Sequence, residues 1–130
     1  MKNKLIILLL LTFTHTAYSE EIFILHNDTI KPKTTDIKKE YTLTLINVDG
    51  LKNGINEINS KLTKNESQSK AIADELIPKQ KSKMQEGMRG LGLIKKWDIR
   101  KLPAIVFNNG TYVYYGSNVE AAIKLWERRE

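Results

Sequence analysis

The stretch that most constrains this chain lies near its C-terminus and reads LPAIVFNNGTYVYYGSNVEAAIKLW, residues 102–126. Pro103 leads a short apolar run at 104–107, which predicts a strand. The Asn-Asn-Gly that follows is typical of a hairpin turn, because asparagine and glycine tolerate positive φ. A return strand at 111–115 and an amphipathic helix complete the unit. The apolar face of that helix comprises Val119, Ala122, Ile123 and Trp126.

The residues upstream predict two more strands and two helices. The run at 21–26 suits a buried strand, and the run at 41–48 has apolar residues on both faces, as a central strand covered on each side would. Helical spacing follows at 51–62 and again after residue 65, where Pro78 is expected to kink or split the helix. We therefore expect an α/β fold with a central mixed sheet of about four strands, in the order β-β-α-α-β-β-α, flanked by helices.

The N-terminus has the pattern of a secretory signal peptide. Lys2 and Lys4 precede an apolar run at 5–13, and Ala17-Tyr18-Ser19 places small residues where a signal peptidase reads them. The apolar run is too short for a permanent membrane anchor, which needs about 20 residues. We expect a signal peptide at 1–19, cleavage between Ser19 and Glu20, and one exported domain at 20–130 with no stable membrane anchor.

Composition narrows the possible functions further. The chain contains no cysteine, so disulfides, thiol chemistry and thiolate metal sites are excluded. Without Lys2 and Lys4, the formal net charge falls from +6 to +4. The lysines are spread as on a solvated surface and are not interleaved with the tyrosines, so we expect no nucleic-acid partner. An acidic partner or an anionic envelope surface stays open.

The motifs of an enzyme are also missing. His26 is the one histidine outside the predicted signal peptide, so a multi-histidine metal site cannot form, and we expect no metal and no cofactor. The phosphate-binding spacing G-x-G-x-x-G after a strand is not found at Gly87, Gly90 and Gly92. We interpret these residues as packing or helix-end glycines. A serine hydrolase site around His26 and Asp28 is formally possible, but no nucleophile elbow accompanies it. We therefore predict that the protein is not an enzyme.

Four segments carry a resemblance to a known family. They are IFILHND at 22–28, LTLINVDG at 43–50, GLIKKWDIRKLPAIVF at 92–107 and YVYYG at 112–116. With the signal peptide, they resemble the small exported proteins of integrating conjugative elements, a domain of unknown function that looks like thioredoxin. The resemblance implies a thioredoxin-like fold and a periplasmic accessory role in conjugative DNA transfer by a type IV secretion system. It implies envelope proteins of the conjugation apparatus as partners and no established catalytic residues.

The resemblance also suggests where a site would lie. Thioredoxins place their two cysteines just after the first strand, where this chain has His26, Asn27, Asp28 and Thr29. Thiol exchange is impossible there, so a redox-inactive binding or assembly surface is expected, formed with the proline loop of Lys101, Leu102, Pro103 and Ala104. We expect the Leu102–Pro103 bond to be cis and to lie close to residues 26–28.

Two other readings remain open. The chain could be a secreted basic protein that binds an acidic partner. Less favoured is an envelope hydrolase that uses His26 and Asp28.

Overall fold

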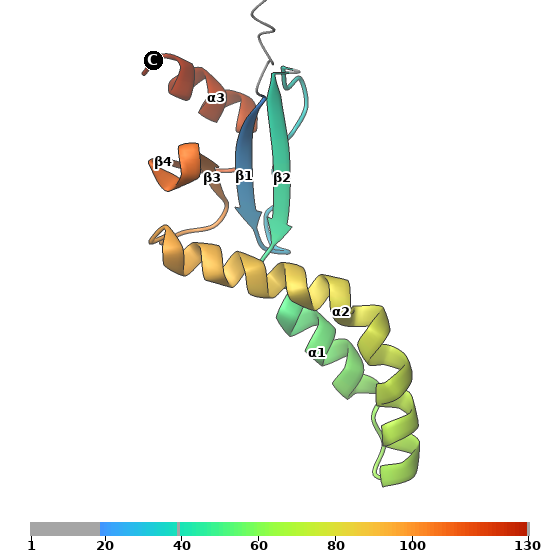
Figure 1. The fold of residues 1–130 in the computed structure, drawn as a ribbon. Helices are drawn as coiled ribbons and strands as arrows, with labels where there is room; N and C mark the ends of the chain where they lie inside the picture. Colours follow the sequence, from blue (N-terminus) through green and yellow to red (C-terminus); the bar gives the residue numbers. More distant parts are fainter. Residues whose placement is uncertain (1–18, 39, 130) are drawn as a thin grey trace, which may run out of the picture.

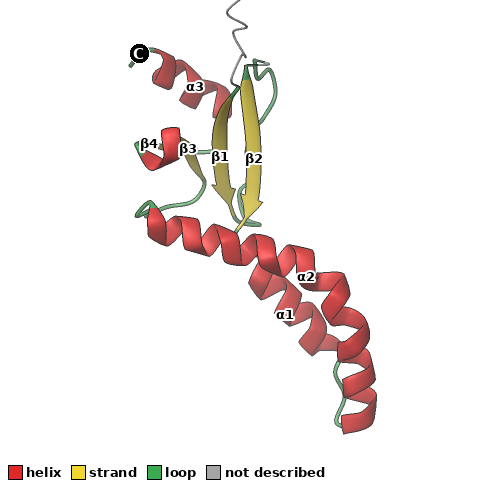
Figure 2. Cartoon of the chain, in the orientation of Figure 1, coloured by secondary structure: helices red, strands yellow, loops and turns green. Residues whose placement is uncertain are grey.

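The computed structural model describes residues 19–38 and 40–129, so the predicted signal peptide lies outside it except for Ser19. Within these residues the chain forms four strands, three α-helices and one 3₁₀ turn (Figures 1 and 2). In chain order they are β1 (Glu20–His26), β2 (Tyr41–Asn47), α1 (Gly50–Lys61), α2 (Glu66–Lys96), β3 (Ala104–Phe107), η1 (Asn108–Gly110), β4 (Tyr112–Tyr115) and α3 (Val119–Glu127).

The four strands form one mixed sheet in the order β2-β1-β3-β4. β1 and β2 are parallel, whereas β3 runs antiparallel to both β1 and β4. The structure confirms the predicted α/β class, the mixed sheet of four strands and the predicted order of strands and helices along the chain.

β2 lies at the edge of the sheet, so its prediction as a central strand was wrong. The reason is that both of its faces are partly covered although, among the described residues, it pairs with a strand on one side only. Ile46 packs on one face with residues of α2, and Leu43 on the other packs against the core beneath α3. Leu45 is 43% exposed, so the cover is incomplete.

The alternation of side chains along β1 gives the sheet a core on each face. Ile22 and Ile24 belong to the first core, which lies under α3, and Phe23 and Leu25 to the second, which lies under the C-terminal part of α2. The first core also contains Ile105, Phe107, Val119, Ala122 and Ile123. The second also contains Ile46, Val48, Ile99, Ala104 and Val106.

Helix α2 is a single helix of 31 residues, about 46 Å long. Pro78 lies inside it and does not split it, although Figure 1 shows that α2 bends near its middle, as helices do at proline. Helix α1 lies alongside α2, and together they extend beyond the sheet as a helical arm, defined as α1 with residues 66–86 (Figure 1).

Glycines let the two helices of the arm approach closely. A Cβ atom added at Gly50 would collide with the carbonyl oxygen of Lys83, and one at Gly87 with the backbone nitrogen of Leu51. Gly90 lies against the side chains of Ile46 and Val48 in the same way. The packing role predicted for Gly87 and Gly90 is therefore confirmed.

The connection between the parallel strands β1 and β2 contains no helix in its described residues. Such crossovers are usually helical. Here the chain is held by backbone hydrogen bonds of Lys33, whose N–H donates to Ser117 (2.7 Å) and whose carbonyl accepts from Val119 (3.3 Å).

None of the helices in residues 19–38 and 40–129 has the length and apolar character of a bilayer span.

Candidate functional site

The two segments predicted to form one binding surface meet at the same end of the sheet. Residues 26–29 begin with the last residue of β1, and residues 101–104 lead into β3. Leu25 and Ala104 are register partners, and the Cα atoms of antiparallel partners are about 4.5–5.5 Å apart. His26 and Pro103 each lie one residue beyond this pair, so the two segments are side by side as expected.

The proline segment is anchored through its backbone. The Leu102–Pro103 peptide bond is cis, as the resemblance implies. The carbonyl of Pro103 accepts a hydrogen bond of 3.0 Å from Gly116, just after β4. Pro103 and Ala104 are buried, Leu102 is half-buried and Lys101 is exposed. The side chains that this segment offers to a partner are therefore those of Lys101 and Leu102.

His26 and Asn27 shape the turn that follows β1. The imidazole Nδ1 of His26 lies 3.1 Å from the carbonyl oxygen of Asn27. The Oδ1 atom of Asn27 accepts from the N–H groups of Thr29 (3.0 Å) and Ile30 (3.3 Å), which is an Asx turn. This turn reverses the chain and leaves Thr29 exposed.

Asp28 is held by groups that come from β2 and α1. Its two carboxylate oxygens accept from the side-chain amides of Asn47 (2.7 Å) and Asn53 (2.6 Å). Its backbone N–H donates to the Asp49 carboxylate at 3.1 Å. The Asn47 and Asn53 hydrogen bonds, and more weakly the positive charges of His26 and Lys83, hold the pKa of Asp28 below its usual value. The Asp28 carboxylate is thus held by side chains of β2 and of α1, the first helix of the helical arm.

The geometry around His26 differs from that of a hydrolase triad. In such a triad the carboxylate holds the imidazole by a hydrogen bond, but among the described residues Asp28 bonds to two asparagines and not to His26. The described part of the chain also contains no group of three His, Asp or Glu residues that could hold a metal ion.

The partners of Asp28 were not predicted from the sequence. Asn47 falls in the strand predicted at 41–48 and Asn53 in the helix predicted at 51–62, with no site role for either. A signal was nevertheless present, because the carboxyl ends of parallel strands share one edge of a sheet and functional groups gather there. His26 and Asn47 are register partners at that edge. Predicting that the first two strands are parallel would have brought Asn47 next to Asp28.

The sequence that leads into the proline segment is rich in cations. Residues 89–101 contain five cations and the single carboxylate Asp98, an excess of four that equals the net charge of residues 20–130. Arg100 forms an ion pair with Asp98 at 3.0 Å, and both side chains are exposed. The cations of this segment are Arg89, Lys95, Lys96, Arg100 and Lys101.

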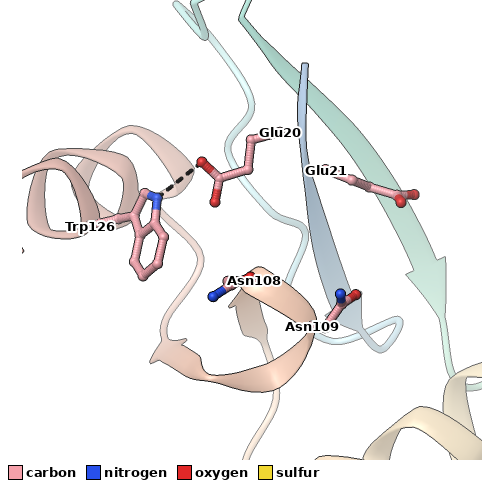
Figure 3. A pocket seen from close by; sticks show the side chains of 5 residues that line it. All are labelled: Glu20, Glu21, Asn108, Asn109 and Trp126. Atoms are coloured by element: carbon pink, nitrogen blue, oxygen red, sulfur yellow. Dashed lines mark hydrogen bonds between the residues drawn. The ribbon is translucent and has the colours of Figure 1, made fainter. Parts of the chain in front are cut away.

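A polar hollow of about 510 Å³ lies where β1 begins. Figure 3 shows Glu20 directed at Trp126 of α3, whose indole N–H donates to it at 3.2 Å, whereas Glu21 points towards β2. Glu21 accepts from the Thr44 hydroxyl at 2.8 Å. Both carboxylates therefore have protein partners, and the hydrogen bond between Glu20 and Trp126 joins β1 to α3.

These features define an α/β protein that has a mixed four-stranded sheet, a cis-proline edge without cysteine and a projecting helical arm. The chain belongs to a protein family of unknown function, DUF1525, whose model matches residues 20–130. No curated protein and no solved structure matches it.

Proposed function

We propose that this protein is a periplasmic accessory protein of a conjugative-element type IV secretion system, and that it acts as a redox-inactive binding or assembly module. Its partners are envelope proteins of the conjugation apparatus. The contact surface is formed by residues 26–29 and 101–104. The resemblance of the sequence to exported proteins of integrating conjugative elements supports the cellular setting.

The proposed domain type is thioredoxin-like. The strand directions support this assignment, because a parallel pair, β1 and β2, is extended by the antiparallel strands β3 and β4, and a closing helix follows. A proline directly before β3, beside the end of β1, is a further point of similarity. In this chain His26-Asn27-Asp28-Thr29 stands where the cysteines of thioredoxins would be, so no thiolate can form.

The observation that carries the proposal is the placement of these two segments next to each other in a chain without cysteine. The β1–β3 register brings His26 beside Pro103. A surface of this kind binds an extended peptide through backbone pairing and needs no reactive side chain. Lys101 and Leu102 then supply the side chains that select the partner.

Charge favours a partner that is acidic at this edge. The cations of residues 89–101 lie directly before the proline segment, and opposite charges attract across an interface and speed its formation. The second candidate function, a secreted basic protein with an acidic target outside the conjugation apparatus, uses the same charges. The identity of the captured protein separates the two functions.

Site-specific photocrosslinking in donor cells tests the proposed surface. A photoreactive residue at position 101 is expected to capture an envelope protein of the conjugation apparatus. A matched probe at Lys124, an exposed lysine of α3, is expected to capture none. Capture of the same proteins from both positions, or of none from either, would contradict the proposed surface.

Gene deletion tests the proposed role. Deletion in the donor is expected to lower the conjugation frequency, and wild-type protein supplied from a plasmid is expected to restore it. An unchanged transfer frequency after deletion would contradict the role in conjugation.

The variant His26→Ala is expected to fold normally, because the His26 side chain is only half-buried at a strand end.

A further inference from the structure

The base of the helical arm contains an apolar groove that nothing in the described chain fills. It has a volume of about 440 Å³, and its apolar lining consists of Val48, Leu51, Ile55 and Leu91. Ile55 of α1 is 44% exposed and Leu91 of α2 is 47% exposed. Met88, three residues before Leu91 on the same face of α2, is 59% exposed. Large apolar side chains therefore gather in the open on two neighbouring helices.

These exposed side chains lie beside the close contact between the two helices. Helices α1 and α2 meet at Gly50 and Gly87, whose backbones touch, and at Gly54, against which the Met84 side chain packs. In a helical bundle, an apolar face of this kind is covered by a further helix. An amphipathic helix laid into a groove between two helices is a common mode of recognition.

The charges at the two ends of the exposed face indicate what such a helix carries. Lys81, Met84, Met88, Leu91 and Lys95 recur along α2 at spacings of three and four residues, so they share one face. Lys81 and Lys95 are both exposed and lie about 21 Å apart along the helix. The apolar centre is thus bounded by a positive charge at each end.

These charges disfavour a second copy of the chain as the occupant. If two α2 helices paired antiparallel about Met88, Lys81 of each would face Lys95 of the other. If they paired parallel in register, each lysine would face its own counterpart. Like charges placed opposite each other across an interface are unfavourable, whereas carboxylates at those positions would complement both lysines.

From this we propose that the groove binds an amphipathic helix of another protein, whose apolar stripe is flanked at both ends by Asp or Glu. The apolar side chains of that helix cover Ile55, Met88 and Leu91. Its carboxylates pair with Lys81 and Lys95. None of the residues 26–29 and 101–104 lines the groove, so it constitutes a second interaction surface.

Two synthetic helical peptides test the inference by fluorescence anisotropy with the protein isolated from its producing cells. Both carry the same leucine stripe, flanked in one by glutamates spaced as Lys81 and Lys95 are, and in the other by lysines. The glutamate peptide is expected to bind about tenfold more tightly. Reversing the charges in the K81E/K95E variant is expected to reverse this preference.

The variant Leu91→Ser tests the apolar part of the groove and is expected to weaken binding about tenfold. Its control is Leu125→Ser, which alters a similarly exposed leucine of α3, 40% accessible, and is expected to leave binding unchanged. Equal binding of both peptides by the wild-type protein, or binding that survives Leu91→Ser, would overturn the inference.

Two further measurements identify other occupants. Sedimentation analysis would overturn the inference if the protein self-associates and Leu91→Ser abolishes the association, because the groove would then bind a second copy. In a flotation assay with phosphatidylglycerol vesicles, binding of the wild-type protein that Leu91→Ser abolishes would also overturn the inference, because the groove would then bind a membrane surface.

Discussion

The side-chain amide of Asn53, near the start of α1, donates a hydrogen bond of 2.6 Å to the carboxylate of Asp28, just after β1. This bond joins the turn beside the proline edge to the helical arm. Asn47 binds the other oxygen of the same carboxylate at 2.7 Å. The end of the first strand is therefore fixed to both β2 and α1.

The hydrogen bonds from Asn47 and Asn53 to Asp28 predict a pH dependence of stability. The pKa of Asp28 in the folded protein lies below its ordinary value of 3.8, and unfolding restores that value. Stability from this group is therefore complete above the ordinary value and is lost as the pH falls through the folded pKa. Asn53→Ala is expected to raise the pKa of Asp28, measured by NMR titration of its carboxyl carbon.

Asn56→Ala is the control for this titration. Asn56 lines the same polar groove of the arm as Asp28 and Asn53, but it is not a hydrogen-bond partner that lowers the pKa of Asp28. It is expected to leave that pKa unchanged. An equal change in both variants would show that the Asn53 hydrogen bond does not set the pKa.

Gly87→Ala is expected to lower the free energy of unfolding by about 1–3 kcal/mol, because the new methyl group would collide with the backbone of α1 at Leu51. Gly92→Ala is the matched control in the same helix. No atom lies within 4 Å of a Cβ at Gly92, so the higher helix propensity of alanine is expected to raise stability by about 0.5–1 kcal/mol. Urea unfolding of both variants measures the difference, and a loss of stability at both positions would contradict the close contact.

Phe107→Ala is expected to destabilise the protein by about 3–5 kcal/mol, because Phe107 is fully buried and its removal leaves a cavity. Its ring stacks on Trp126 with centroids 5.2 Å apart. Leu125→Ala, at the exposed neighbour of Trp126, is expected to cost less than about 1 kcal/mol. Thermal unfolding followed by circular dichroism compares the two, and equal losses would be inconsistent with a core centred on Phe107.

Mass spectrometry of the exported protein tests the predicted processing. Cleavage between Ser19 and Glu20 is expected, so that the mature chain starts with the residue that begins β1. Ser19→Arg is expected to block cleavage, because signal peptidase reads small residues at this position. Thr16→Arg, outside the two positions that the peptidase reads, is the control. A mature protein that starts elsewhere would contradict the predicted site.

Local patterns predicted most of the fold. The proline-led strand, the Asn-Asn-Gly turn and the apolar face of the closing helix all follow from neighbouring residues, and each is present in the structure. The edge position of β2 does not follow from such patterns. It depends on which strand pairs with β1 on each side, and that pairing is set by contacts between distant residues.

The proline edge was predicted and the environment of Asp28 was not. His26 and Pro103 could be placed together because the resemblance supplied the pairing of the two segments. Asn53 could not, because its contact with Asp28 depends on where α1 starts relative to the sheet. Pro78 was expected to kink or split its helix, and α2 stays one helix that bends near its middle.

The contact between α1 and α2 limits how related chains can diverge. At Gly50 and Gly87 any side chain would collide with the facing helix, so we expect family members to retain glycine there even where the rest of the arm has changed. At Gly92 the space is open, and other residues are expected in relatives. Evolution can therefore alter what the arm recognises while the spacing of its two helices stays fixed.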